Sequence, residues 1–80
     1  MDLERVISAL APTDVVGRAP AEVRDLAYDT RAVEPGSLFF CVPGERTDGH
    51  LFAADAVSRG VKAIVVERVL ELDVAQVVVP

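Results

Sequence analysis

The chain has 80 residues, of which 51% are hydrophobic and 26% are charged, which predicts one small folded domain rather than a disordered segment. Its formal net charge of −5 at pH 7 argues against nucleic acid and anionic membranes as partners, and no apolar run is long enough to span a bilayer. A single cysteine, Cys41, excludes an internal disulfide and a multi-cysteine metal site, and an N-terminus without an export pattern favours a cytoplasmic location.

The N-terminal segment predicts a short amphipathic helix followed by a loop. Apolar side chains recur at the i, i+3, i+4 and i+7 positions of one helix face, at Leu3, Val6, Ile7 and Leu10. Asp2 can cap the first turn of this helix, and Pro12 marks its end. Residues 13–20 are rich in Pro, Gly, Thr and Asp, a composition typical of a loop.

The middle of the chain predicts two strands that flank a tight turn. An imperfect alternation over residues 23–28 indicates the first strand. Glu34-Pro35-Gly36-Ser37 predicts a type II turn, because Pro presets φ at the second position and Gly accepts a positive φ at the third. The continuous apolar run from Leu38 to Val42 is typical of a strand buried on both faces, in which Cys41 would be an inert buried side chain.

The second half of the chain predicts a βαβ unit. A polar loop over residues 43–49 leads into a helix expected from His50 to Ser58, and Gly60 suits the left-handed position that follows a helix. The inner face of this helix is expected to consist of Phe52, Ala53, Ala56 and Val57. Further buried strands are expected over residues 63–66 and 76–79. The expected fold is therefore α/β, with a small mixed or parallel sheet and a βαβ unit flanked by two short helices.

This topology predicts where a ligand would bind. Open parallel sheets bind ligands beyond the carboxyl ends of their strands, which here is the segment from Pro43 to His50. Gly44 and Gly49 allow the backbone of that segment to approach a ligand closely. Residues 28–31 begin at the end of another predicted strand, the one expected over residues 23–28. They would lie beside the segment from Pro43 to His50 if the two strands were neighbours. A ring, hydroxyls, guanidinium groups and an imidazole gathered at one place are typical of a site for a nucleotide with phosphates.

An ordered set of motifs extends from Tyr28 to Val66. It begins with Asp29-Thr30-Arg31, continues with Pro-Gly-Ser-Leu-Phe at 35–39 and Gly-Glu-Arg-Thr-Asp-Gly-His-Leu-Phe at 44–52, and ends with Ala56-Val57 and Gly60. This set resembles the N-terminal domain of the Mur ligases, whose pattern is Asp-Ser-Arg, Pro-Gly-Asp-Leu-Phe and Gly-x-x-x-Asp-Gly-His-x-Phe in that order. Within the family, residues 38–44 are most similar to the MurE type, and the MurF type remains open because it shares much of the pattern.

The resemblance implies a part in making bacterial peptidoglycan precursors. Mur ligases join an amino acid to a UDP-N-acetylmuramoyl peptide with ATP and magnesium. The MurE type adds diaminopimelate or lysine to UDP-MurNAc-L-Ala-D-Glu, whereas the MurF type adds D-alanyl-D-alanine. Residues 1–80 would then form the single UDP-substrate-binding domain, without the central ATPase and C-terminal domains that are its partners in the whole ligase. The resemblance therefore implies a fragment with no activity and no cofactor of its own.

The resemblance also implies which residues serve the site. Those expected to contact the UDP moiety are Tyr28, Thr30, Arg31, Glu45, Arg46 and Thr47. Those expected to support the loop and the helix start are Asp29, Gly44, Asp48, Gly49 and His50. No residue is expected to be catalytic or to bind a metal. The chain departs from the family pattern at three places: Thr30 stands where the family has serine, and Ser37 and Leu51 stand where acids are common.

Local chemistry offers structural alternatives for several of these residues. Asp29 can close a turn by accepting from its own backbone, and Arg31 can pair with Asp29 or Glu34 at the surface. Tyr28 can be an ordinary edge aromatic, and Asp48 and His50 can cap the helix or pack at its start. A second functional hypothesis is a non-catalytic scaffold module with the same fold, favoured by the acids that offset the arginines in these segments.

Overall fold

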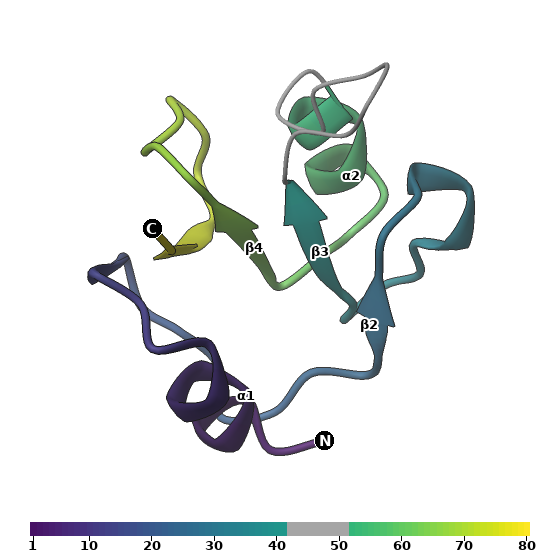
Figure 1. The fold of residues 1–80 in the computed structure, drawn as a ribbon. Helices are drawn as coiled ribbons and strands as arrows, with labels where there is room; N and C mark the ends of the chain where they lie inside the picture. The colour runs from purple at the N-terminus through teal and green to yellow at the C-terminus, as the bar shows by residue number, and fades with distance from the viewer. Residues whose placement is uncertain (42–51) are drawn as a thin grey trace.

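The computed structural model describes residues 1–41 and 52–80, in which a mixed five-stranded sheet carries one helix on each face (Figure 1). The strands are β1 (Asp14–Val16), β2 (Leu26–Ala27), β3 (Leu38–Cys41), β4 (Ala63–Val66) and β5 (Ala75–Val78). The helices are α1 (Leu3–Leu10), α2 (Ala53–Ser58) and the short 3-10 helix η1 (Thr30–Ala32). The order across the sheet is β1-β5-β4-β3-β2.

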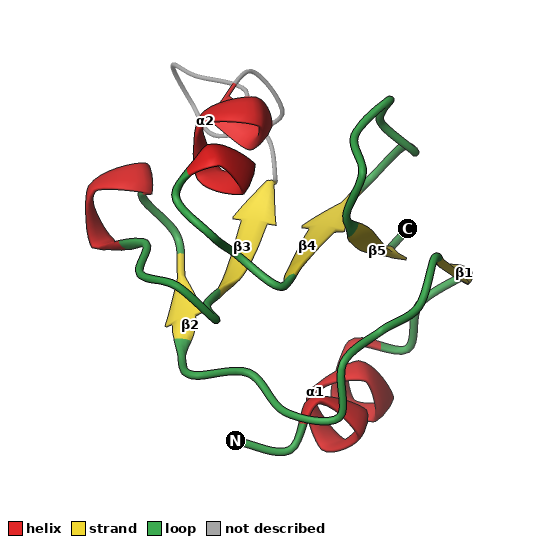
Figure 2. Ribbon diagram, turned by 180° about the vertical axis from the view of Figure 1, so that it is seen from behind, coloured by secondary structure: helices red, strands yellow, loops and turns green. Residues whose placement is uncertain are grey.

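Four of the five strands are parallel, and they include the two strands of the predicted βαβ unit. β3 and β4 pair in parallel with Leu38 opposite Ala63 and Cys41 opposite Val66, and α2 crosses between them. β2 adds to the free side of β3, and β5 adds to the free side of β4, both in parallel. Only β1 is antiparallel, and it pairs with β5 at the far edge (Figure 2). The predicted α/β class with a small mixed sheet is confirmed.

α1 forms where the apolar periodicity predicts it. The carboxylate of Asp2 accepts a hydrogen bond from the backbone N–H of Glu4 at 3.0 Å, which satisfies one of the free donors of the first turn. The helix ends at Ala11, whose left-handed backbone lets its N–H donate to the carbonyl of Ile7, and Pro12 follows. The apolar face of α1 packs on one face of the sheet, and Leu3 is fully buried there.

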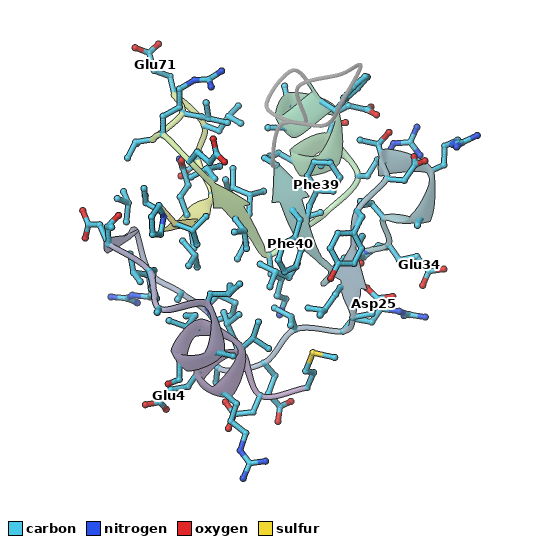
Figure 3. The ribbon with its side chains drawn as sticks, in the orientation of Figure 1. Glu4, Asp25, Glu34, Phe39, Phe40 and Glu71 are labelled. Atoms are coloured by element: carbon cyan, nitrogen blue, oxygen red, sulfur yellow. The ribbon has the colours of Figure 1, made fainter. Side chains whose placement is uncertain are left out.

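The two faces of the sheet form two separate hydrophobic clusters. On the α2 side, Phe39, Cys41 and Ile64 pack with Ala53 and Ala56 of the helix. On the α1 side, the buried side chains are Leu3, Val23, Leu38, Ala63, Val65, Ala75 and Val77. Because alternate residues of a strand point to opposite faces, the consecutive phenylalanines of β3 separate, Phe39 towards α2 and Phe40 towards α1 (Figure 3).

The predicted turn at residues 34–37 is confirmed and is tied to the end of α2. Gly36 has φ +95°, and the N–H of Ser37 donates to the carbonyl of Glu34 at 3.0 Å. Gly60 also has φ +95°, and its carbonyl accepts from the N–H of Gly36 at 2.8 Å. The buried hydroxyl of Ser37 accepts from the N–H of Glu34 and donates to Asp25, so it links the turn to the segment before β2. These bonds fix the register of β2 and β3 relative to each other.

Several predicted boundaries are wrong. Residues 13–20 are not entirely loop, because β1 lies within them and pairs with β5. The strand expected over 23–28 is reduced to β2, because Val23 leaves the sheet and its N–H donates to the carbonyl of Met1. The strand expected over 76–79 is β5, which begins and ends one residue earlier. Phe52 was expected on the inner face of α2, but it precedes the helix and is 43% exposed.

One buried polar side chain fastens the acidic connection between β4 and β5. Gln76 is 2% exposed, and its amide oxygen accepts from the N–H of Leu70 while its amide nitrogen donates to the carbonyls of Leu70 and Leu72. A buried amide is tolerated only when such partners are present. In the part of the chain that the structure describes, no helix is long and apolar enough to cross a membrane.

Candidate functional site

The two segments that were predicted to form a site each follow a strand, and these two strands are parallel neighbours in the sheet. β2 and β3 pair with Leu26 opposite Leu38 and Ala27 opposite Phe39, so their carboxyl ends lie at the same edge of the sheet. Residues 28–31 follow β2 directly at that edge, and β3 ends there at Cys41. The condition on which the prediction depended, that the two strands be neighbours, is therefore met. Figure 2 shows both strands running in the same direction towards this edge.

Asp29 and Arg31 form a closed unit at this edge. One Asp29 carboxylate oxygen accepts from the backbone N–H of Arg31 at 2.9 Å, which caps η1. The guanidinium of Arg31 donates to both oxygens, from Nε at 3.2 Å and from a terminal nitrogen at 2.8 Å. Both structural alternatives predicted for these residues, the turn closed by Asp29 and its pairing with Arg31, are present. Glu34, the other predicted partner of Arg31, pairs with Arg24 at 2.7 Å.

Thr30 is held between these two charged residues. It is the first residue of η1, it is partly buried, and its carbonyl accepts from the N–H of Val33 at 3.2 Å. The Asp29 cap on one side and the burial of Val33 on the other fix the backbone of Thr30. The backbone of Thr30 is therefore fixed within η1, which follows β2 at this edge of the sheet.

Tyr28 is the aromatic residue that the sequence predicted at this site. Its ring also makes a contact that the sequence did not predict. Tyr28 is 69% exposed, and its ring stacks on Phe40 with 4.8 Å between the centroids and 27° between the planes. Phe40 was expected to be buried as part of a continuous apolar strand, and it is instead only partly buried. The period of two along β3 places Phe40 on the face opposite Phe39, but its contact with Tyr28 also depends on the pairing of β2 with β3.

The remaining predicted site residues lie outside the described residues. They are Gly44, Glu45, Arg46, Thr47, Asp48, Gly49 and His50, together with Val42 at the predicted end of a strand and Leu51. Of the predicted contact residues, the structure thus places Tyr28, Thr30 and Arg31. Among residues 1–41 and 52–80, no cluster of three or more His, Cys, Asp or Glu side chains is arranged to hold a metal ion.

The ion pair of Asp29 with Arg31 leads to a prediction about the pKa of Asp29. The side-chain hydrogen bond from Arg31, followed by the backbone N–H of Arg31, lowers the pKa of Asp29 from 3.8 to about 2. Because the folded pKa lies below the ordinary value, this stabilisation is complete above pH 3.8 and is lost as the pH falls through about 2. We expect a carboxyl-detected NMR titration of the chain to report this low pKa for Asp29.

Two variants test whether Arg31 causes the low pKa of Asp29. Arg31→Gln removes the guanidinium and is expected to return the Asp29 pKa towards 3.8. Arg24→Gln removes an arginine that pairs with Glu34 instead, so it serves as the matched control and is expected to leave Asp29 unchanged. An Asp29 that titrates near 3.8 in the unmodified chain would contradict the assigned cause.

The chain is similar in sequence to known ligases. Residues 22–80 match the family described as Mur ligase family, catalytic domain. A protein of Geobacillus thermodenitrificans named UDP-N-acetylmuramoyl-L-alanyl-D-glutamate--2,6-diaminopimelate ligase is 48% identical over 80 residues, which is 100% of this chain and 16% of that protein. A protein of the same name from Listeria innocua is 40% identical over 74 residues, which is 92% of this chain and 15% of that protein.

The chain is also similar in structure to a solved ligase. The crystal structure of MurF from Acinetobacter baumannii matches with a TM-score of 0.88 and 29% sequence identity, over 98% of this chain and 17% of that one. The chain thus spans 15% to 17% of the length of these three relatives.

Proposed function

This chain belongs to the Mur ligase family, and we propose that it binds the UDP moiety of a UDP-N-acetylmuramoyl peptide for an ATP-dependent amide-forming ligase. The observation that carries the proposal is the parallel pairing of β2 with β3, which brings Tyr28, Thr30 and Arg31 to the carboxyl edge of the sheet. In such sheets this edge is where ligands bind. The side chains there are suited to binding and orienting a nucleotide rather than to breaking bonds.

Each described residue has a part in this binding. The ring of Tyr28 offers an exposed surface for a flat base, and the hydroxyl of Thr30 offers a hydrogen bond to ribose or phosphate. The Asp29–Arg31 pair fixes the backbone that carries Tyr28 and Thr30. The terminal nitrogens of Arg31 remain at an exposed surface. Glu45, Arg46 and Thr47 are proposed to complete the contacts from the neighbouring segment, with Gly44, Asp48, Gly49 and His50 as its support.

The chemistry of the whole ligase is proposed to take place on other domains. ATP and magnesium would be held by a central domain, where the substrate carboxyl is activated before the incoming amino acid attacks it. This chain would hold the distant UDP end of the same substrate, so that the reacting carboxyl is presented in a fixed position. The 80-residue chain alone is therefore expected to bind substrate without converting it.

We propose the MurE type, which adds diaminopimelate or lysine, over the MurF type. The sequence relatives named as 2,6-diaminopimelate ligases are 48% and 40% identical to this chain over nearly all of it. The MurF structure is 29% identical, although its backbone agrees closely. Since fold is shared across the family, the sequence identity is the observation that favours the MurE type, and MurF remains the second candidate.

The test is an NMR titration of the isotope-labelled chain with UDP-N-acetylmuramic acid, with ATP as the control ligand. We expect amide shifts that cluster at residues 28–31 and at the segment after Cys41, and that are absent with ATP. Shifts that are equally large with ATP, or that fall at α1 and β1 instead, would contradict the proposed site. A chain that shows no shifts at millimolar ligand would favour a scaffold role for this fold.

Thr30→Val tests the proposed hydroxyl contact. The substitution keeps the shape of the side chain and removes one hydrogen bond to a charged group, so the Kd for UDP-N-acetylmuramic acid is expected to rise about tenfold. Thr13→Val is the matched control, since Thr13 is exposed and its hydroxyl donates to the carbonyl of Val78 in β5, which is separated from β2 by two strands of the sheet. An equal Kd in Thr30→Val and the unmodified chain would give Thr30 a structural role only.

A further inference from the structure

Phe40 supports the exposed ring of Tyr28 from the adjacent strand. β2 and β3 pair with Leu26 opposite Leu38 and Ala27 opposite Phe39, and Tyr28 and Phe40 are the next residues on the two segments. Phe40 packs on the α1 face of the sheet. The two rings stack at 4.8 Å with 27° between their planes. This separation lies within the range in which aromatic pairs attract each other beyond their simple area of contact.

The two rings differ in how firmly they are held. Phe40 is partly buried and packs against the hydrophobic cluster of Leu38, Val65 and Val77 under α1. Tyr28 lies just beyond the end of β2 and is 69% exposed. An exposed aromatic side chain at a strand end would otherwise exchange among several rotamers, so its contact with the anchored ring selects one orientation.

We propose that Phe40 is a positioning residue for nucleotide binding: it orients the Tyr28 ring so that the exposed part of that ring stacks on the base of the ligand. The inference rests on the proposed function, because it concerns the same UDP site, and it adds a residue that would not itself touch the ligand. Because stacking on a ring tolerates any flat base, this platform supplies affinity for a base and leaves the choice of uracil to other contacts.

The test measures UDP binding to the 80-residue chain by NMR, with Phe40→Leu as the principal variant. Tyr28 is the only tyrosine and the chain has no tryptophan, so the tyrosine ring protons report on this one ring. Loss of the aromatic pair is expected to raise the Kd for UDP about threefold to tenfold. Phe40→Tyr keeps an aromatic ring at this position, so it is the conservative variant and is expected to retain the original Kd within a factor of about two. Phe40→Met replaces Phe40→Leu if the latter does not fold.

A double-mutant cycle distinguishes positioning from a general structural role. If Phe40 acts through Tyr28, then Phe40→Leu has no further effect on the Kd in a Tyr28→Leu background. An undiminished effect in that background, an unchanged Kd in Phe40→Leu, or a Phe40→Tyr chain that binds as poorly as Phe40→Leu would each overturn the inference. Those results leave the proposed function intact, whereas an unmodified chain with no UDP-induced shifts at residues 28–31 would contradict the proposed function itself.

Discussion

Phe39→Ala is expected to lower the free energy of unfolding by about 3–5 kcal/mol, the cost of removing a fully packed aromatic side chain. Phe39 is 2% exposed, and it lies in the cluster that joins β3 and β4 to Ala53 and Ala56 of α2. A domain of this size has a small total stability, so most of the molecules are expected to be unfolded at 37 °C. Urea denaturation followed by circular dichroism measures the loss.

The adjacent residue provides the control for this prediction. Phe40 occupies the next position on the same strand but faces α1 and is only partly buried, so Phe40→Ala is expected to cost clearly less stability. The two variants remove the same atoms from the same strand and differ in the face that they affect and in how deeply the ring is buried. Equal losses of unfolding free energy would contradict the assignment of Phe39 to the core and of Phe40 to the edge of the binding surface.

The second large effect is expected at Gly60, which lies between α2 and β4 and contacts the turn that precedes β3. Gly60→Ala is expected to lower the unfolding free energy by about 2–3 kcal/mol, because Gly60 has φ +95° and an added Cβ would lie 3.2 Å from the backbone Cα of Pro35. Both parts of this contact are firmly held, since the carbonyl of Gly60 accepts from the N–H of Gly36. Differential scanning calorimetry or urea denaturation measures the change.

Gly36→Ala is a matched control that separates the two sources of this cost. Gly36 has the same φ of +95°, but an added Cβ would meet the Cβ of Arg24 at 3.4 Å and its backbone N at 4.0 Å, both ordinary contacts. This variant therefore carries the backbone strain alone and is expected to lose about 1 kcal/mol. If Gly36→Ala proved as costly as Gly60→Ala, the contact with Pro35 would contribute nothing.

Local signals in the sequence were sufficient to predict those elements whose boundaries follow from the pattern of their own residues. α1 forms where it was predicted, because its apolar period from Leu3 to Leu10, its Asp2 cap and Pro12 agree with one another. β4 was predicted with equal accuracy, because four consecutive apolar residues between polar ones leave little choice. The turn at 34–37 followed from Pro35 and Gly36, whose backbone preferences are intrinsic.

The elements that the sequence missed depend on partners distant along the chain. β1 has three residues, of which two are exposed, and becomes a strand only because β5 offers a free edge. Its surroundings of proline, glycine and threonine indicated a loop, which is correct for residues 17–20 but wrong for 14–16. β2 was overestimated for the converse reason: Val23 is apolar because it packs beneath α1, not because it belongs to the sheet.

At the candidate site, residue types were predictable but their contacts were not. The resemblance and the βαβ topology indicated Tyr28, Thr30 and Arg31, and the structure places all three at one sheet edge. The stacking of Tyr28 on Phe40 depends on the register of two strands, which no local pattern in the sequence states. The bidentate pairing of Arg31 with Asp29 was one of two alternatives, and in the structure the other candidate partner, Glu34, pairs with Arg24.

The antiparallel edge of the sheet has a consequence for the order in which this domain folds as it is synthesised. β1 emerges from the ribosome early, yet its partner β5 lies close to residue 80, and the bond from Thr13 to Val78 closes a loop of 65 positions. The βαβ unit of β3, α2 and β4 joins segments much nearer in sequence, so it can condense first. Until β5 has been translated, the segment that becomes β1 has no strand to pair with, and that interval is when the nascent chain is most exposed to aggregation and to chaperones.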